Sequence, residues 1–170
     1  MEGRDALYRE AACDYGAALV RLAHAYEDDP EKRRDLIQDI HLALWRSLEA
    51  FDRRCSLRTW VYRVAHNAAA TYVIRQKRTR ARMMVSLEEV EAMPVDAVDI
   101  DRDLALQRLT ALIQRLKPVD RQVIVSYLEG MEAAAIGELT GISARHVATK
   151  VHRIKNILAR SFNEGGRHGG

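Results

Sequence analysis

The feature that most constrains the fold is a pair of helical patterns separated by a glycine near the end of the chain. A short apolar pattern covers about Met131 to Leu139, and a longer basic amphipathic pattern runs from Ser143 to about Phe162. We expect Gly141 to adopt the positive φ of a tight turn and Ser143 to cap the longer helix. Two helices joined in this way are typical of a helix-turn-helix, whose second helix enters the major groove of DNA.

The longer helix is expected to have one apolar and one polar face. With about 100° of rotation per residue, four aliphatic side chains share one face and should pack against Ile136 and Leu139 of the shorter helix: Val147, Val151, Ile154 and Leu158. The remaining surface carries Arg145, His146, Thr149, Lys150, His152, Arg153 and Asn156. No acidic residue occurs between Glu138 and Glu164. Short polar groups can meet base edges while cations beside them meet phosphates, so this helix is predicted to read duplex DNA.

The rest of the chain also predicts helices, since 48% of its residues are hydrophobic and glycine and proline are few. One helix is expected from about Asp5 to Glu27, and a second from Pro30 with Asp29 as its cap. A third, capped by Ser56, runs toward a basic stretch. The second helix has an apolar stripe of period three to four formed by Leu36, Ile37, Ile40, Leu44, Trp45 and Leu48. The predicted fold class is therefore all-α.

The charge of the chain changes from basic to acidic between Met83 and Asp103. This segment carries seven acidic residues against the single Arg102, contains Pro94 and shows no clean period, so we interpret it as an acidic linker. The chain is predicted to form two small helical domains, residues 1–82 and residues 104–163, joined by the linker 83–103. Residues 164–170 are expected to be a flexible tail.

Composition also limits the classes of function. The net charge is only +3, so the placement of the cations matters more than their excess. Cys13 and Cys55 match no metal-ligand spacing and are expected to be reduced thiols. With no secretory signal and no apolar run long enough to span a bilayer, we expect a soluble cytoplasmic protein without membrane insertion. No catalytic motif, metal spacing or phosphate loop is present, so neither an enzyme nor a cofactor is expected.

A basic helix end has two open interpretations. Five cations lie between Arg75 and Arg82, and the preceding helix carries Trp60, Tyr62, Asn67 and Tyr72. Cations can follow the backbone of a single strand while aromatic and amide groups hold unstacked bases. A charge run is also typical of a solvated face, and Trp60 and Tyr72 suit the core equally well.

The polar face of the second helix is open as well. Asp35, Gln38, Asp39 and His41 alternate there with the apolar stripe. This face is either bare solvent surface or a docking face for another protein, and periodicity does not separate the two.

Three blocks resemble segments of a known family. Residues Asp35 to Trp45 resemble the polymerase-binding helix of bacterial sigma factors, and residues Leu57 to Asn67 are similar to the promoter-melting segment of the extracytoplasmic-function (ECF) group of the sigma-70 family. Residues Leu116 to Arg153 resemble that group's second DNA-binding domain. The blocks stand in the family's order and cover nearly the whole chain. The resemblance implies a sigma factor that binds core RNA polymerase and directs promoter recognition, strand opening and transcription initiation, with no catalysis of its own.

The resemblance also implies roles for individual residues. The set that would dock on the β and β′ subunits of core RNA polymerase is Asp35, Leu36, Gln38, Asp39, His41, Leu42 and Trp45. The set that would hold the non-template single strand of the −10 element is Phe51, Ser56, Trp60, Tyr62, Arg63, Asn67, Arg75, Lys77, Arg78 and Arg80. The set that would read the −35 duplex is Arg145, His146, Thr149, Lys150, His152, Arg153 and Asn156. An anti-sigma factor is an implied partner.

Four residues depart from the family pattern. Arg33 and Arg34 stand where an acidic pair is common, Ala148 where a cation is common, and Glu132 where a Ser or Thr cap is usual. The missing cation at Ala148 predicts a promoter preference unlike that of related proteins.

Other functions explain less of the sequence. A helix-turn-helix repressor or activator accounts for the second domain, but it leaves residues 35–45 and 57–67 without a role. A sigma-like decoy that binds a sigma antagonist would need neither the basic helix end nor the polar reading face.

Overall fold

The computed structural model describes residues 2–76, 84–94 and 102–163, and it confirms the all-α class. The N-terminal bundle consists of α1 (Glu2–Tyr26), α2 (Pro30–Ser47), the short 3-10 helix η1 (Leu48–Ala50) and α3 (Leu57–Gln76). The C-terminal bundle consists of α5 (Arg102–Arg115), α6 (Pro118–Leu128), α7 (Ala133–Thr140) and α8 (Ala144–Asn163). Between them in sequence lies α4 (Leu87–Ala92). The described residues contain no strand.

Local signals set the N-terminal bundle as predicted. Asp29 Oδ1 accepts hydrogen bonds from the backbone N–H groups of Glu31 and Lys32 at 2.9 and 3.0 Å, which caps α2. Ser56 Oγ accepts one from Thr59 N–H at 3.0 Å at the start of α3. The predicted stripe of α2 faces the core: Leu36, Ile40, Leu44 and Leu48 are buried, and Ile37 and Trp45 are half-buried.

The helix-turn-helix geometry is confirmed. Gly141 has φ +78°, and Ser143 Oγ accepts a hydrogen bond from His146 N–H at 3.2 Å. A Cβ atom on Gly137 would lie 2.9 Å from the carbonyl oxygen of Ile142, so α7 and the turn pack closer than any other residue would allow. Val147 and Ile154 are fully buried, and Val151 and Leu158 are half-buried.

The acidic segment differs from the predicted linker. Its described part contains α4, which begins with a capping box between Ser86 and Glu89 and buries Leu87 and Val90. Val85 pairs with Leu116 in an isolated parallel bridge that ties the segment to the C-terminal bundle. The prediction missed α4 because a helix of fewer than two turns gives too little periodicity to recognise beneath an acidic composition.

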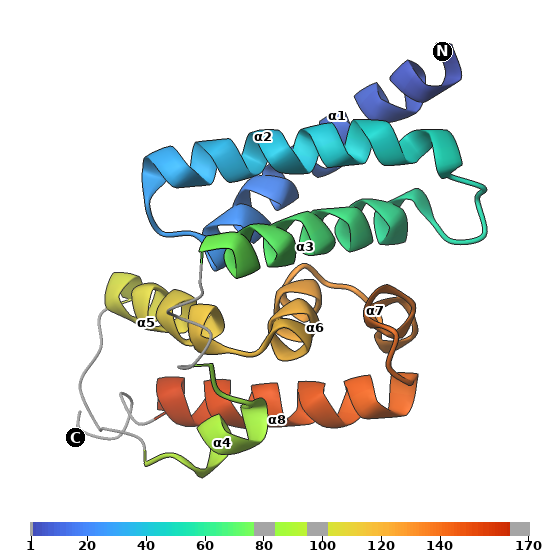
Figure 1. Ribbon diagram of the computed structural model, residues 1–170. Coiled ribbons are helices and arrows are strands. Elements are labelled where there is room, and N and C mark those ends of the chain that lie inside the picture. Colours follow the sequence, from blue (N-terminus) through green and yellow to red (C-terminus); the bar gives the residue numbers. More distant parts are fainter. Residues whose placement is uncertain (1, 77–83, 95–101, 164–170) are drawn as a thin grey trace.

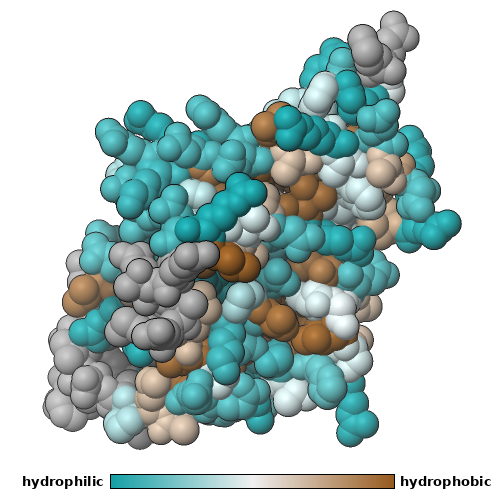
Figure 2. All heavy atoms as spheres, in the orientation of Figure 1, coloured by the Kyte–Doolittle hydropathy of each residue, from teal (hydrophilic) through white to brown (hydrophobic). Residues whose placement is uncertain are grey.

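The two bundles are stacked. Figure 1 shows α1, α2 and α3 above α5, α6 and α7, with α8 and α4 on the far side from α2. Helix α3 packs against α6 and α7, and α1 packs against α5. On the face seen in Figure 2, hydrophilic side chains cover much of the outer surface, and apolar ones show between the upper and lower halves. Among the described residues, no helix is long and apolar enough to cross a membrane.

Candidate polymerase and nucleic-acid interfaces

Four of the residues predicted to dock on the polymerase form an exposed surface on α2. Asp35, Gln38, Asp39 and Leu42 follow the spacing of one helix face, and all four are exposed. Leu42 keeps 46% of its surface accessible. An apolar side chain surrounded by acidic and amide groups gives this face both a hydrophobic contact and charge for a basic partner.

The other three residues of that set lie inside the N-terminal bundle. Leu36 is fully buried in the apolar stripe, so its assignment as a polymerase contact is wrong. His41 is half-buried, its Nδ1 lies 3.0 Å from the hydroxyl of Tyr8, and burial lowers its pKa. Trp45 donates its indole N–H to Asp5 at 3.0 Å. His41 and Trp45 therefore fasten α1 to α2 at the edge of this exposed face.

The loop after η1 has a strained tip. Arg53 is a non-glycine residue with φ 62°, the left-handed region that costs an ordinary side chain energy. Asp52 stabilises the turn, since its carboxylate accepts a hydrogen bond from Arg54 N–H at 3.1 Å and pairs with Arg54 Nε at 2.9 Å. A cavity of about 480 Å³ opens beside this loop, lined by Asp52, Arg54, Cys55, Trp60, Arg63 and Glu138. Cys55, like Cys13, is a free thiol.

Aromatic side chains form one wall of this region. The rings of Phe51 and Trp60 pack with their centroids 5.3 Å apart, and the indole N–H of Trp60 donates to Ser47 Oγ at 3.0 Å. Both side chains are half-buried, and Trp60 also lines the cavity beside the loop. Tyr72 donates its hydroxyl to Glu27 at 2.9 Å and thereby joins α3 to the end of α1.

The C-terminal bundle covers part of the set predicted for the single strand. Tyr62 is buried, and its hydroxyl donates to Glu129 Oε2 at 3.2 Å. Burial first, and then the Glu129 charge, raise the pKa of Tyr62 to about 12. In this arrangement Tyr62 is therefore not accessible to a base. Arg63 donates to the carbonyl oxygen of Glu138 at 2.9 Å.

The other members of this set divide in two. Ser56, Asn67 and Arg75 are exposed on the N-terminal bundle. Lys77, Arg78 and Arg80 lie outside the described residues.

Glu129 joins the two bundles, a role that no local pattern beyond its place at a helix end indicates. Its two carboxylate oxygens accept from Nε and from a terminal nitrogen of Arg21, each at 2.7 Å, and its carbonyl oxygen accepts from Arg58. The hydrogen bond from Arg21 lowers the pKa of Glu129. Burial acts in the opposite direction, and the positive charge of Arg21 lowers this pKa further.

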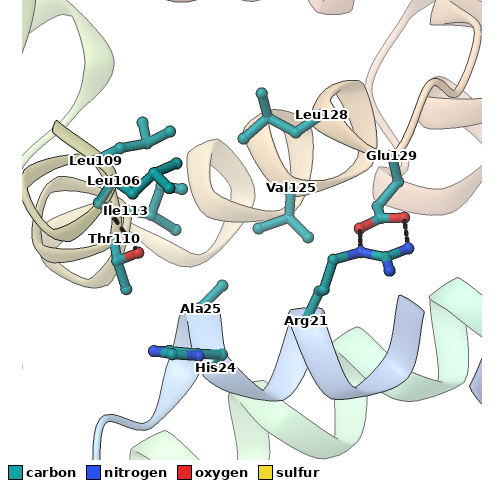
Figure 3. A pocket seen from close by; sticks show the side chains of 10 residues that line it. All are labelled: Arg21, His24, Ala25, Leu106, Leu109, Thr110, Ile113, Val125, Leu128 and Glu129. Atoms are coloured by element: carbon teal, nitrogen blue, oxygen red, sulfur yellow. Dashed lines mark hydrogen bonds and ion pairs between the residues drawn. The ribbon is translucent and has the colours of Figure 1, made fainter. Parts of the chain in front are cut away.

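Figure 3 shows the Arg21–Glu129 pair at one end of a cavity of about 660 Å³ between α1, α5 and α6. Among its lining residues, Leu106 and Leu128 are exposed.

A buried polar cluster lies where α1, α3 and α6 meet. His66 is fully buried, with Nδ1 2.8 Å from the hydroxyl of Tyr26 and Nε2 3.4 Å from Ser126 Oγ. The guanidinium of Arg121, also buried, lies 4.8 Å above the ring of Tyr26 and donates to the carbonyl oxygen of Leu116 at 3.0 Å. Burial first, and then the Arg121 charge, lower the pKa of His66 to about 3. This histidine is therefore neutral at physiological pH.

The polar face predicted on α8 is exposed. Five side chains of the predicted duplex-reading set face solvent: Arg145, His146, Thr149, His152 and Asn156. Thr149 donates its hydroxyl to the carbonyl oxygen of Arg145 at 3.1 Å, which leaves the lone pairs of Oγ1 pointing outward.

The two remaining cations of that set are engaged within the C-terminal bundle. Lys150 Nζ lies 2.5 Å from Asp120 Oδ1, whose side chain is 5% exposed, so Lys150 stabilises the packing of α8 on α6. In this structure Lys150 is therefore not free to contact DNA. Arg153 pairs with Glu88 and with Glu91, the latter at 3.3 Å. Asp120 and the two glutamates were not predicted as partners of α8, because nothing local in the sequence marks them as such.

Comparison with known proteins identifies both bundles. The model for Sigma-70 region 2 matches residues 14–79, and the model for Sigma-70 region 4 matches residues 106–158. The RNA polymerase sigma factor CarQ of Myxococcus xanthus is 31% identical over 121 residues, which are 70% of this chain and 68% of that protein. The ECF RNA polymerase sigma factor SigG of Mycobacterium tuberculosis is 29% identical over 135 residues, which are 78% of this chain and 35% of that protein.

Solved structures show the same fold. The sigma factor RpoE of Bartonella quintana, solved with the anti-sigma factor NepR, superimposes with a TM-score of 0.64 at 19% identity, covering 92% of this chain and 96% of that one. CnrH, solved with the cytosolic domain of CnrY, superimposes with a TM-score of 0.63 at 22% identity, covering 92% of this chain and 87% of that one. The chain thus belongs to the ECF group of the sigma-70 family, the RNA polymerase sigma factors that bind core enzyme and recognise promoters.

Proposed function

We propose that the two bundles divide the work of promoter recognition, with residues 1–82 and 104–163 as the two functional domains. The N-terminal bundle docks on the β and β′ subunits of core RNA polymerase through α2 and holds the −10 strand at α3. The C-terminal bundle reads the −35 duplex with α8. The protein is a specificity subunit without catalytic activity, and it acts in the cytoplasm with the polymerase.

The observation that carries this proposal is the exposure of two separate polar faces on a folded two-bundle chain. On α2, Asp35, Gln38, Asp39 and Leu42 project together, and on α8 the exposed set runs from Arg145 to Asn156. A duplex-binding repressor needs only the second of these faces. The test is to add the purified chain to core RNA polymerase and to measure transcription from promoters selected from a random library. Duplex binding without any stimulated transcription would contradict the proposal.

Truncating the apolar centre of the α2 face is expected to weaken binding to core RNA polymerase. Leu42→Ala should lower affinity roughly tenfold, because a central apolar contact of an interface typically contributes about 1–2 kcal/mol. Leu104→Ala is the matched control, since Leu104 is 40% exposed and Leu42 is 46% exposed, but Leu104 lies on α5. Titration of labelled core enzyme gives both affinities, and equal losses in the two variants would remove α2 from the docking surface.

Asn67→Ala is expected to impair strand opening and to leave core binding unchanged. An amide that holds an unpaired base offsets part of the few kcal/mol that flipping requires, so the open complex should decline roughly tenfold. Thr71→Ala is the control, because Thr71 is exposed one turn further along α3. Permanganate footprinting reports the melted bases. A loss of core binding in Asn67→Ala would instead place this residue on the docking surface.

The stacked arrangement must open before the single strand can reach all of its proposed site. Tyr62 and Arg63 are covered by Glu129 and Glu138 of the C-terminal bundle, while Asn67 is free. We further propose an anti-sigma factor as a partner, since the two superimposed structures were solved with CnrY and NepR. The apolar cavity between α1, α5 and α6 offers such a partner a surface that includes both bundles.

A further inference from the structure

Helix α4 brings carboxylates to one flank of α8. Arg153 contacts Glu88 through a terminal nitrogen and Glu91 through Nε, the second pair at 3.3 Å. Lys150 Nζ is 3.7 Å from the same oxygen of Glu88. Arg160, two turns further along α8, donates to the carbonyl oxygen of Glu91 at 2.6 Å. Three cations of one helix, Lys150, Arg153 and Arg160, are thus engaged by a six-residue acidic helix.

This contact is anchored by apolar burial and by hydrogen bonds at the start of α4. Leu87 is fully buried, and its backbone N–H donates to the buried carboxylate of Asp120 at 3.1 Å. Val90 is buried one turn later, and Ser86 with Glu89 caps the helix. The pKa of Glu88 is lowered first by a hydrogen bond from its own backbone N–H and then by Lys150 and Arg153. The carboxylate is therefore ionised at neutral pH.

The flank that α4 covers is the one a DNA strand would need. Arg153 follows directly after the exposed His152 and precedes the fully buried Ile154, so it stands at the border between the reading face and the packed face. Cations at such a border meet phosphates when the middle of the helix meets base edges. In this structure two carboxylates already hold that guanidinium.

We propose that α4 is an internal competitor of the DNA backbone, in which Glu88 and Glu91 occupy the cation flank of α8 that a promoter duplex takes over. The inference rests on the proposed role of α8 as the −35 reader. The contact of α4 with α8 lowers the affinity for duplex DNA, and a bound duplex weakens the contact of α4 with α8 by the same factor, because coupling between two binding events is reciprocal. Any event that draws α4 away from α8 raises the affinity for duplex DNA.

The test compares variants of the full chain in which glutamates of α4 are replaced by uncharged glutamines. Because phosphate contacts are independent of sequence, the probe is a short fluorescent duplex of random sequence, titrated at several salt concentrations. Glu88→Gln/Glu91→Gln is expected to bind roughly threefold to tenfold tighter than the parent, the range for freeing one or two partly exposed ion pairs. Its salt dependence should steepen by about one phosphate contact.

Glu89→Gln is the matched control. Glu89 is exposed on the same helix and accepts from Ser86 N–H, a bond that glutamine also makes. This variant therefore loses one charge, as the single variant Glu88→Gln does, without touching α8. It should bind duplex within about twofold of the parent, because only the long-range electrostatic attraction changes and salt screens it. Equal gains in Glu89→Gln and in the single variant Glu88→Gln would overturn the competition.

A second background tells the inference apart from the function on which it rests. In Arg153→Ala, the gain from Glu88→Gln/Glu91→Gln should largely disappear, since the contested cation is gone. Arg145→Ala, which α4 does not contact, reports whether α8 binds duplex at all. If Arg145→Ala leaves binding unchanged, both proposals fail. If it weakens binding while Glu88→Gln/Glu91→Gln adds nothing, only the competition fails.

Discussion

Asp120→Ala is expected to lower the free energy of unfolding by about 2–4 kcal/mol. The Asp120 carboxylate is 5% exposed and bonds to two groups at once, Lys150 Nζ at 2.5 Å and the backbone N–H of Leu87 at 3.1 Å. Removing it leaves the buried N–H of Leu87 without this acceptor, and it leaves the Lys150 ammonium only the weaker pair with Glu88 at 3.7 Å. The Lys150 side chain is 21% exposed, so water recovers part of the loss and the lower half of the range is expected. Thermal unfolding should shift down by about 5–12 °C.

Asp120→Asn separates the two interactions of this carboxylate. The amide oxygen can still accept from Leu87 N–H but carries no charge, so the loss should be about half that of Asp120→Ala. Circular dichroism melting curves of the parent and both variants measure the effect. Equal stabilities of all three proteins, within about 0.5 kcal/mol, would show that Asp120 does not hold α4 and α8 on α6.

Mild acid is expected to destabilise the stacked arrangement through His66. The pKa of this histidine is lowered from 6.5 to about 3, because burial disfavours the charged imidazolium and the Arg121 charge adds to this. Between these two pH values His66 is protonated in the unfolded chain and neutral in the folded chain. The contribution of neutral His66 to the free energy of unfolding is therefore complete above pH 6.5 and is lost progressively as the pH falls toward about 3. The loss amounts to about 1.4 kcal/mol for each pH unit.

The measurement is the free energy of unfolding in urea from about pH 7 to about pH 5, where His66 alone should cost the parent about 2 kcal/mol. His66→Gln does not titrate and can still reach Tyr26 and Ser126, so its stability should fall less steeply. His152→Gln, which removes an exposed histidine of α8, is the control and should follow the parent. Parallel curves for the parent and His66→Gln would mean that His66 takes up its proton in the folded state.

Local patterns explain why so much of the fold follows from the residues. Each cap expected at Asp29, Ser56 and Ser143 accepts a backbone N–H, and Gly141 has the predicted positive φ. These features depend on neighbours within one turn, and so a single sequence contains all the information they need. The exposed face of α8 follows in the same way from a period of about 3.6 residues.

Long-range pairings decided which predicted site residues are free. Leu36 lies within the apolar stripe of α2 and is buried, although the family resemblance alone placed it on the docking surface. Nothing near Tyr62 or Glu129 in sequence marks them as partners, since they lie 67 positions apart. A glutamate after a helix is equally suited to solvent and to an arginine of another helix, and only the stacking of the bundles selects Arg21.

The sequence by itself determined the longer helices, the caps at Asp29, Ser56 and Ser143, the exposed polar face of α8 and the family, because all of these follow from local spacing and from motif order. The tertiary structure decided that Glu129 closes the N-terminal bundle onto the C-terminal bundle, that His66 is kept neutral, and that α4 holds Arg153. The physical reason is that burial and ion pairing depend on which distant surfaces meet. Many acidic and basic positions are compatible with each helix, and only packing in three dimensions makes one pair desolvated and specific.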